Sequence, residues 1–203
     1  MKDTARFESA DLLSLTRPVL GAFIFFELGR TPESWLVLPA TALACATDYV
    51  DGQVARRAGA PRLSGRAIDN VCDALFLAFA FAAYASQSVW SDARFGSATR
   101  YWAEANWLPL YALCASFGLY AIRLRMEAGR GLDPGRSPRG HTAGIANYAL
   151  AIVGALAVLP GVTITPWLLE PAFVTVALLN ASAVGENLLL MLIMVAPGRG
   201  PKA

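Results

Sequence analysis

The sequence has only three cysteines and one histidine among its 203 residues. Cys45, Cys72 and Cys114 stand in or beside apolar runs, and none belongs to a CxxC or similar motif. We interpret them as small buried residues, which argues against a disulfide framework or a zinc site. The segment MKDTARFESADLL is mixed in charge, and no short apolar core with a cleavage site follows it, so we expect no cleavable signal peptide.

Charged residues are also scarce, at 16% of the chain, whereas hydrophobic residues make up 56% and the mean hydropathy is +0.46. A soluble domain has about 45–50% apolar and about 25% charged residues. The sequence contains no credible strand pattern, and a chain in lipid must satisfy its backbone polar groups internally. It therefore predicts an all-α integral membrane protein with a single domain over residues 1–203. The formal net charge of +2 gives no reason to expect a nucleic-acid partner.

Six apolar runs are candidates for membrane-spanning helices, each of which needs about 20 mostly apolar residues. Their approximate bounds are Leu15–Leu28, Trp35–Val54, Ala67–Val89, Trp107–Ile122, Ala143–Leu159 and Pro171–Val195. Before the first run, residues 1–14 are expected to form a short amphipathic helix on the membrane surface, with Phe7, Leu12 and Leu13 facing lipid. After the last run, residues 196–203 form a tail.

Positive charge is distributed very unevenly between the two sides that these six runs define. Of the 17 lysines and arginines, only Arg30, Arg94 and Arg100 fall on the side away from the two termini. Connections rich in Lys and Arg remain on the cytoplasmic side of a membrane. The sequence therefore predicts a multi-pass protein of the inner (cytoplasmic) membrane, with both termini in the cytoplasm.

Four aspartates stand close together in the sequence DYVDGQVARRAGAPRLSGRAIDNVCD, which covers residues 48–73. Asp48 and Asp51 are three residues apart at the end of the second run, and Asp69 and Asp73 are four apart at the start of the third. Residues at either spacing share one face of a helix. Because a short connection makes the two helices antiparallel neighbours, the two acidic pairs are expected to face each other at the cytoplasmic side.

Four carboxylates near hydrocarbon cannot all remain ionised and unpaired. Either some of them are protonated, or divalent cations neutralise them. The group contains no histidine or cysteine, and oxygen ligands suit hard cations such as Mg²⁺. Pairs of such ions commonly serve phosphoryl chemistry.

Residues between the aspartates suit a phosphate ligand. Gly52 and Gly65 each lie four residues from an aspartate and leave room for a large ligand, while Arg56 offers a planar fork to diphosphate oxygens. The alternatives are that the glycines only allow tight helix packing and that Arg56 only anchors the helix end on the cytoplasmic side.

The pattern Asp48-x-x-Asp51-Gly52-x-x-Ala55-Arg56, eight residues, then Gly65-x-x-x-Asp69-x-x-x-Asp73 resembles the signature of the CDP-alcohol phosphotransferase family. The resemblance implies two Mg²⁺ or Mn²⁺ ions, an active site facing the cytoplasm and a homodimer. It also implies roles for individual residues: metal ligation by Asp48, Asp51 and Asp69, general-base action by Asp73 with a contact to the second metal, and a CDP site lined by Gly52, Ala55, Arg56 and Gly65.

The function expected from this resemblance is transfer of the phosphatidyl group of CDP-diacylglycerol to a small hydroxyl acceptor, with release of CMP, in phospholipid synthesis. An alternative is transfer of a choline- or ethanolamine-type headgroup from a CDP-alcohol to diacylglycerol, because IDNVCDAL is similar to the corresponding stretch of those transferases. A divalent-cation transporter is the alternative from another class. The aspartates stand at one end of the helices only, which argues against an ion pathway.

Several other polar residues have two interpretations each. Arg123, Arg125 and Arg139 either form a pocket for a phosphorylated alcohol or lipid headgroup or only control topology, and His141 is either near the acceptor or an interfacial residue. Glu186, inside the last run, is either functional or protonated and hydrogen-bonded to another helix. Members of the family often carry Leu-Thr-x-x-Arg near the N-terminus, whereas Leu15-Thr16-Arg17 brings the arginine closer, so no role is assigned to Arg17.

Overall fold

The structure is a computed structural model that describes residues 9–57, 63–87, 89, 106–132, 137–162, 164 and 166–196. These residues form helices and no strand, which confirms the all-α prediction for the described part of the chain. The helices are α1 (Ser9–Arg30), α2 (Val37–Arg57), α3 (Leu63–Ser86), α5 (Leu108–Gly129), α6 (Pro138–Ala157) and α7 (Pro166–Val195).

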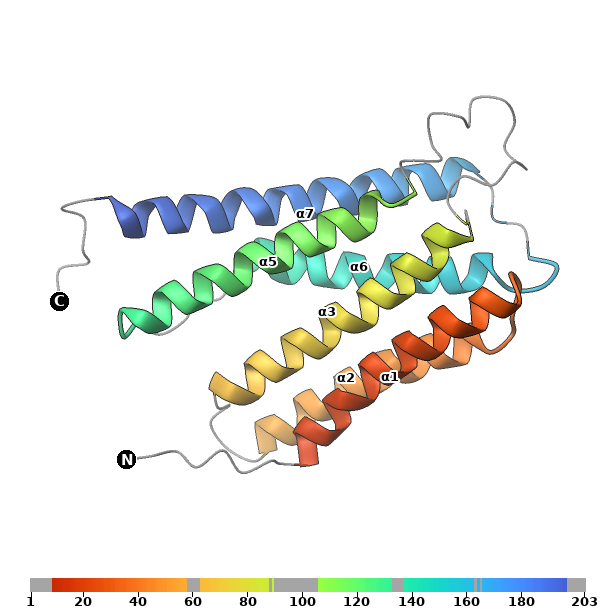
Figure 1. The fold of residues 1–203 in the computed structure, drawn as a ribbon, viewed down its shortest axis with the longest axis horizontal. Helices are drawn as coiled ribbons and strands as arrows, with labels where there is room; N and C mark the ends of the chain where they lie inside the picture. Colours follow the sequence, from red (N-terminus) through yellow and green to blue (C-terminus); the bar gives the residue numbers. More distant parts are fainter. Residues whose placement is uncertain are drawn as a thin grey trace.

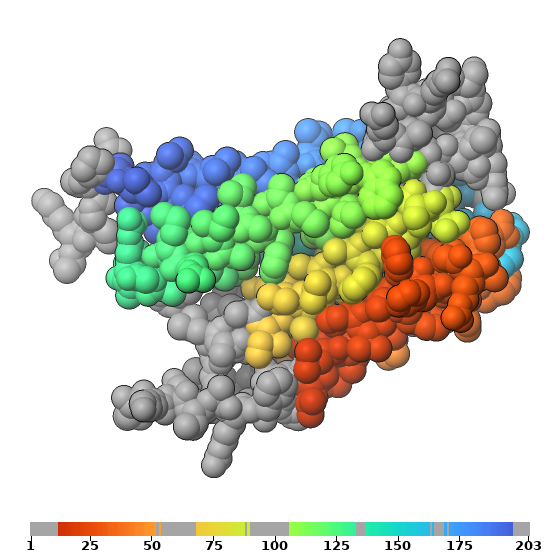
Figure 2. All heavy atoms as spheres, in the orientation of Figure 1, coloured from red at the N-terminus to blue at the C-terminus, as the bar shows by residue number. Residues whose placement is uncertain are grey.

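The helices form one bundle in which α1 packs against α2 and α3, and α7 packs against α5 and α6 (Figure 1). Contacts of α3 with α5 and of α6 with α2 and α3 join the two groups of helices. On one face of the molecule, α1, α3, α5 and α7 lie side by side in that order (Figure 2). The first residue of α1 and the last residue of α7 lie at the same end of the bundle, where α2 and α5 end and α3 begins (Figure 1).

The interior is apolar and closely packed between α1 and α3. Ile24 and Leu28 of α1 and Phe76 and Phe81 of α3 are buried in one cluster. At Gly21 a Cβ atom would lie only 3.0 Å from the Cα atom and carbonyl oxygen of Phe76, so this position needs a glycine for the helices to approach closely.

Large apolar side chains also cover the outside of the bundle, where "exposed" means accessible at the protein surface to either lipid or water. Val19 and Phe26 on α1 and Leu178, Leu189 and Leu192 on α7 are all exposed. An apolar exterior of this kind is unfavourable in water and suits contact with lipid chains.

Four of the described helices are long and apolar enough to cross a membrane, judged by length and composition: Leu12–Arg30, Ile68–Ser86, Pro138–Ala157 and Pro171–Val195. The remaining two, α2 and α5, do not meet this measure. Both carry charged residues, Asp48 and Asp51 in α2 and Arg123 and Arg125 in α5, which lower their hydropathy.

The structure differs from the sequence predictions at the N-terminus and at two cysteines. Residues 9–14 are not part of a separate surface helix but the first turns of α1, because no Gly or Pro interrupts the chain before Pro18. Residues 1–8 and 197–203 lie outside the described part. All three cysteines are free, and Cys72 is buried as predicted, but Cys45 is half-buried on α2 and Cys114 is exposed on α5. A thiol is apolar enough to be tolerated on a lipid-facing surface.

Candidate active site

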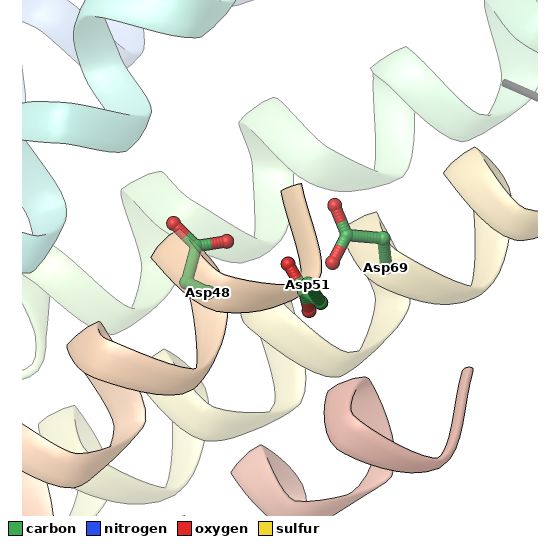
Figure 3. A group of neighbouring side chains, drawn as sticks. All are labelled: Asp48, Asp51 and Asp69. Carbon is green, nitrogen blue, oxygen red and sulfur yellow. The ribbon is translucent and has the colours of Figure 1, made fainter. Parts of the chain in front are cut away.

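Carboxylates from two helices converge near the end of the bundle where both termini of the described chain lie. Asp48 and Asp51 belong to α2, and Asp69 belongs to α3; their side chains gather in one small region (Figure 3). One oxygen of each carboxylate lies within 4.8 Å of the corresponding oxygen of the other two. The predicted convergence is therefore observed for Asp48, Asp51 and Asp69. The expected direct packing of α2 on α3 is not, because both helices pack mainly on α1.

Arg17 of α1 lies at the centre of the acidic cluster, which we define as Asp48, Asp51, Asp69 and Asp73. Its side chain is completely buried, and its guanidinium pairs with all four carboxylates. Nη1 donates to Oδ1 of Asp48 at 3.1 Å and to Oδ1 of Asp73, while Nη2 donates to Asp51 and Asp69. One cation thus faces four acidic groups. In the sequence, Arg17 is marked as unusual only by its position inside an apolar run.

Ser14 is a second contributor from α1 that the sequence did not reveal. Its hydroxyl donates to Asp51 Oδ2 at 2.9 Å and accepts a hydrogen bond from Arg17 Nη2 at 3.1 Å. Ser14 and Arg17 are three residues apart and therefore share a face of the helix. α1 thus covers the acidic cluster with polar groups that neutralise and orient it.

Tyr148 of α6 is the third residue that the sequence analysis missed. Its hydroxyl donates to Oδ1 of Asp73, and its ring stacks on that of Phe76, with centroids 5.8 Å apart and an interplanar angle of 18°. The two hydrogen-bonded residues are 75 positions apart in the chain, so no local spacing rule connects them.

The acidic cluster fits a divalent cation. Hard cations bind oxygen atoms at about 2.0–2.6 Å, so two oxygens on one ion are at most about 5 Å apart. The oxygens of Asp48, Asp51 and Asp69 meet this requirement, and the group contains no nitrogen or sulfur ligand. The same carboxylates already pair with the guanidinium of Arg17, which shows that the geometry of the cluster accommodates positive charge.

The residues expected to line the CDP site lie beside the aspartates on the same two helices. Gly52, Ala55 and Arg56 occupy the last turns of α2, and Gly65 lies in the first turn of α3. Their side-chain surroundings are outside the described part of the structure, so their predicted roles stay predictions.

Of the four residues predicted to surround the acceptor or headgroup, Arg123 is fully buried, whereas Arg125, Arg139 and His141 are exposed. The Arg123 guanidinium lies 5.4 Å from the centre of the Tyr120 ring. The Tyr120 hydroxyl accepts a hydrogen bond from Asn70 at 3.1 Å, and Asn70 follows Asp69 in α3. Arg123 is therefore linked to the acidic cluster through two residues.

Glu186 of α7 contacts the beginning of α6. Its carboxylate accepts a hydrogen bond of 2.5 Å from Ser137, whose oxygen in turn accepts one from the backbone N–H of Gly140. Ser137 is the N-cap of α6. The hydrogen bond to another helix that one interpretation of Glu186 expects is thus observed, with the Ser137 hydroxyl as its donor.

Comparison with known proteins gives one result that bears on function. No curated protein and no solved structure matches the chain. The sequence profile of the CDP-alcohol phosphatidyltransferases, by contrast, matches residues 7–181, a range that includes every residue of the acidic cluster together with Ser14, Arg17 and Tyr148. These enzymes are transferases of substituted phosphate groups, and they typically depend on a metal. Because the match covers most of the chain, the chain belongs to the CDP-alcohol phosphatidyltransferase family.

Proposed function

We propose that the protein transfers the phosphatidyl group of CDP-diacylglycerol to a small hydroxyl acceptor and releases CMP. Family membership supports the general reaction. The proposed location of the site is supported by the convergence of carboxylates from α2 and α3 around the guanidinium of Arg17. Candidate acceptors are glycerol 3-phosphate, an inositol phosphate, serine or a second lipid.

In this proposal Asp48, Asp51 and Asp69 would hold the two Mg²⁺ or Mn²⁺ ions. When bound, such ions neutralise the diphosphate oxygens and stabilise departing CMP. Gly52, Ala55, Arg56 and Gly65 surround the nucleotide part of the donor, and the whole motif over 48–73 belongs to a single domain of residues 1–203.

Asp73 acts as the general base in this proposal. A hydroxyl is a poor nucleophile at neutral pH, so a positioned carboxylate that takes its proton helps the attack. The acceptor oxygen forms a bond to the phosphorus that carries diacylglycerol, and the bond from that phosphorus to the CMP oxygen breaks. The proton of the acceptor moves to Asp73, and CMP leaves with the electron pair.

The alternative direction, headgroup transfer from a CDP-alcohol to diacylglycerol, uses the same acidic cluster. Its support is the similarity of the stretch IDNVCDAL to choline- and ethanolamine-type transferases. The cation-transporter hypothesis is abandoned, because the family is one of transferases.

A panel of donors and acceptors distinguishes the two directions. Purified protein is incubated with CDP-diacylglycerol and each candidate acceptor, or with CDP-choline or CDP-ethanolamine and diacylglycerol, in Mg²⁺, Mn²⁺ or EDTA. We expect CMP release from CDP-diacylglycerol with one acceptor, no release in EDTA, and a lipid product of the corresponding mass. Turnover with CDP-choline or CDP-ethanolamine instead would establish the alternative, and no CMP from any pair would refute both.

We further propose that all six helices cross the inner membrane, with both termini and the acidic cluster on the cytoplasmic side. The support is the bias of lysine and arginine, together with the positions of Asp51 near the end of α2 and Asp69 near the start of α3. These helix ends lie at the end of the bundle where α1 begins and α7 ends (Figure 1). The protein is also expected to form a homodimer, as the family resemblance implies.

Cysteine labelling in intact cells tests this topology. Cys45, Cys72 and Cys114 are replaced, and a single cysteine is introduced as Arg94→Cys or Arg199→Cys. A membrane-impermeant maleimide is expected to label the Arg94→Cys protein in intact cells and the Arg199→Cys protein only after lysis. The reverse pattern would place the acidic cluster on the outer side.

A further inference from the structure

The two carboxylate oxygens of Asp73 have different surroundings. Oδ1 accepts hydrogen bonds from both Arg17 and Tyr148. Among the residues that the structure describes, none donates a hydrogen bond to Oδ2, and the side chain retains 24% of its accessible surface. One oxygen of this carboxylate is therefore anchored, while the other is available to a ligand.

Two other helices, α3 and α7, hold Tyr148 and the part of α6 around it. Its ring stacks on Phe76, which is fully buried and lies three residues after Asp73 on the same helix. The neighbouring Asn147 exchanges two side-chain hydrogen bonds with Asn180 of α7, at 3.3 and 2.9 Å. One turn further along α6, the carbonyl of Ala151 accepts a hydrogen bond of 3.1 Å from Tyr84 of α3. Because α3 and α7 both fix α6, the Tyr148 hydroxyl has little freedom to leave Asp73.

We infer that Tyr148 is a positioning residue for the transfer reaction: its hydroxyl holds Oδ1 of Asp73, so that Oδ2 is the oxygen that receives the proton of the acceptor alcohol. This inference rests on the proposed function and goes beyond it by assigning separate tasks to the two oxygens. A carboxylate without this anchor rotates more freely about its Cβ–Cγ bond. Small losses of alignment at a reacting group are costly, and an error of about 1 Å can lower a rate by about 10²-fold.

A purely structural role is the competing explanation, since a buried tyrosine usually finds a partner for its hydroxyl. The two explanations differ in what the loss of the hydroxyl alone changes. A positioning role predicts slower turnover with unchanged donor binding and unchanged stability. A structural role predicts that any loss of activity follows a loss of stability.

The Tyr148→Phe variant removes the hydroxyl and keeps the stacked ring. We expect kcat to fall by about 10- to 100-fold, with KM for CDP-diacylglycerol within about 2-fold of the wild type and an unchanged thermal midpoint. Tyr111→Phe, at an exposed site on α5, is the matched control and is expected to behave as wild type. Tyr148→Leu also removes the ring and is expected to lower the thermal midpoint in addition.

A double-mutant cycle with Asp73→Asn then asks whether Tyr148 acts through Asp73. In that background Tyr148→Phe is expected to lower the residual turnover by less than about 2-fold, because the base that it positions is gone. An equal loss in both backgrounds, wild-type kcat in Tyr148→Phe, or a loss of kcat that follows the thermal midpoint across the Phe and Leu variants would each overturn the inference. A wild-type protein that releases no CMP would instead refute the proposed function itself.

Discussion

Replacing Asp73 with asparagine is expected to lower turnover by about 10²- to 10⁴-fold, the usual contribution of a general base. Asparagine preserves the size of the side chain but cannot accept the acceptor proton. Binding of the CDP-linked donor should remain substantial, because Asp48, Asp51 and Asp69 keep their oxygens within reach of a shared ion. Single-turnover CMP release and equilibrium binding of radiolabelled donor, both in Mg²⁺, measure the two effects separately.

The comparison variant for this experiment is Asp51→Asn. Asp51 is one of the three carboxylates that converge, and it is buried under Ser14 and Arg17. Its replacement is expected to weaken both metal-dependent donor binding and turnover, whereas Asp73→Asn affects mainly turnover. Near-normal turnover in Asp73→Asn would remove Asp73 as the base.

Arg17→Gln is expected to destabilise the protein strongly when divalent ions are absent. The guanidinium is the one positive group that pairs with all four carboxylates in the described structure, and it is fully buried. Removing one partner of a buried ion pair typically costs about 3–5 kcal/mol. Since Asp48 and Asp69 remain partly exposed, with 43% and 37% of their side-chain surface accessible, we expect the lower end of that range.

Thermal unfolding in detergent, in EDTA and in Mg²⁺, measures this effect. The difference between Arg17→Gln and the wild type should be large in EDTA and smaller in Mg²⁺, because divalent ions take over the neutralisation of the carboxylates. Arg30→Gln, at the exposed far end of the same helix, is the matched control. Equal midpoints of Arg17→Gln and the wild type in EDTA would show that the acidic cluster does not need the guanidinium.

The sequence predicts a role for the aspartates replaced in the first experiment, but none for Arg17. The acidic pairs are predictable because each pair is defined by a spacing within one helix. The short connection also predicts that α2 packs directly on α3, but in the structure both helices pack mainly on α1. Arg17, by contrast, was assigned no role. Its distance along the chain from Asp73, 56 residues, is bridged only by the packing of α1 on α3.

The helices themselves are predictable from the sequence, but their charged ends are not. All six predicted spans correspond to helices, because runs of apolar residues identify them. The charged ends, such as residues 123–129 of α5, were placed outside the spans but continue the helix in the structure. Glu127 is there paired with Arg123 at 3.4 Å, so these charges are neutralised between side chains one helical turn apart.

The amino-acid sequence alone determined that this protein is an all-helical membrane protein, and its motif over residues 48–73 indicated the reaction family. The first conclusion follows from composition and long apolar runs. The second follows from the resemblance of the motif to a family signature, whose spacings of three and four residues place the aspartates on shared helix faces. Only the tertiary structure decided that Ser14, Arg17 and Tyr148 surround the acidic cluster. They come from α1 and α6, and their contacts depend on how whole helices pack, which no short stretch of sequence encodes.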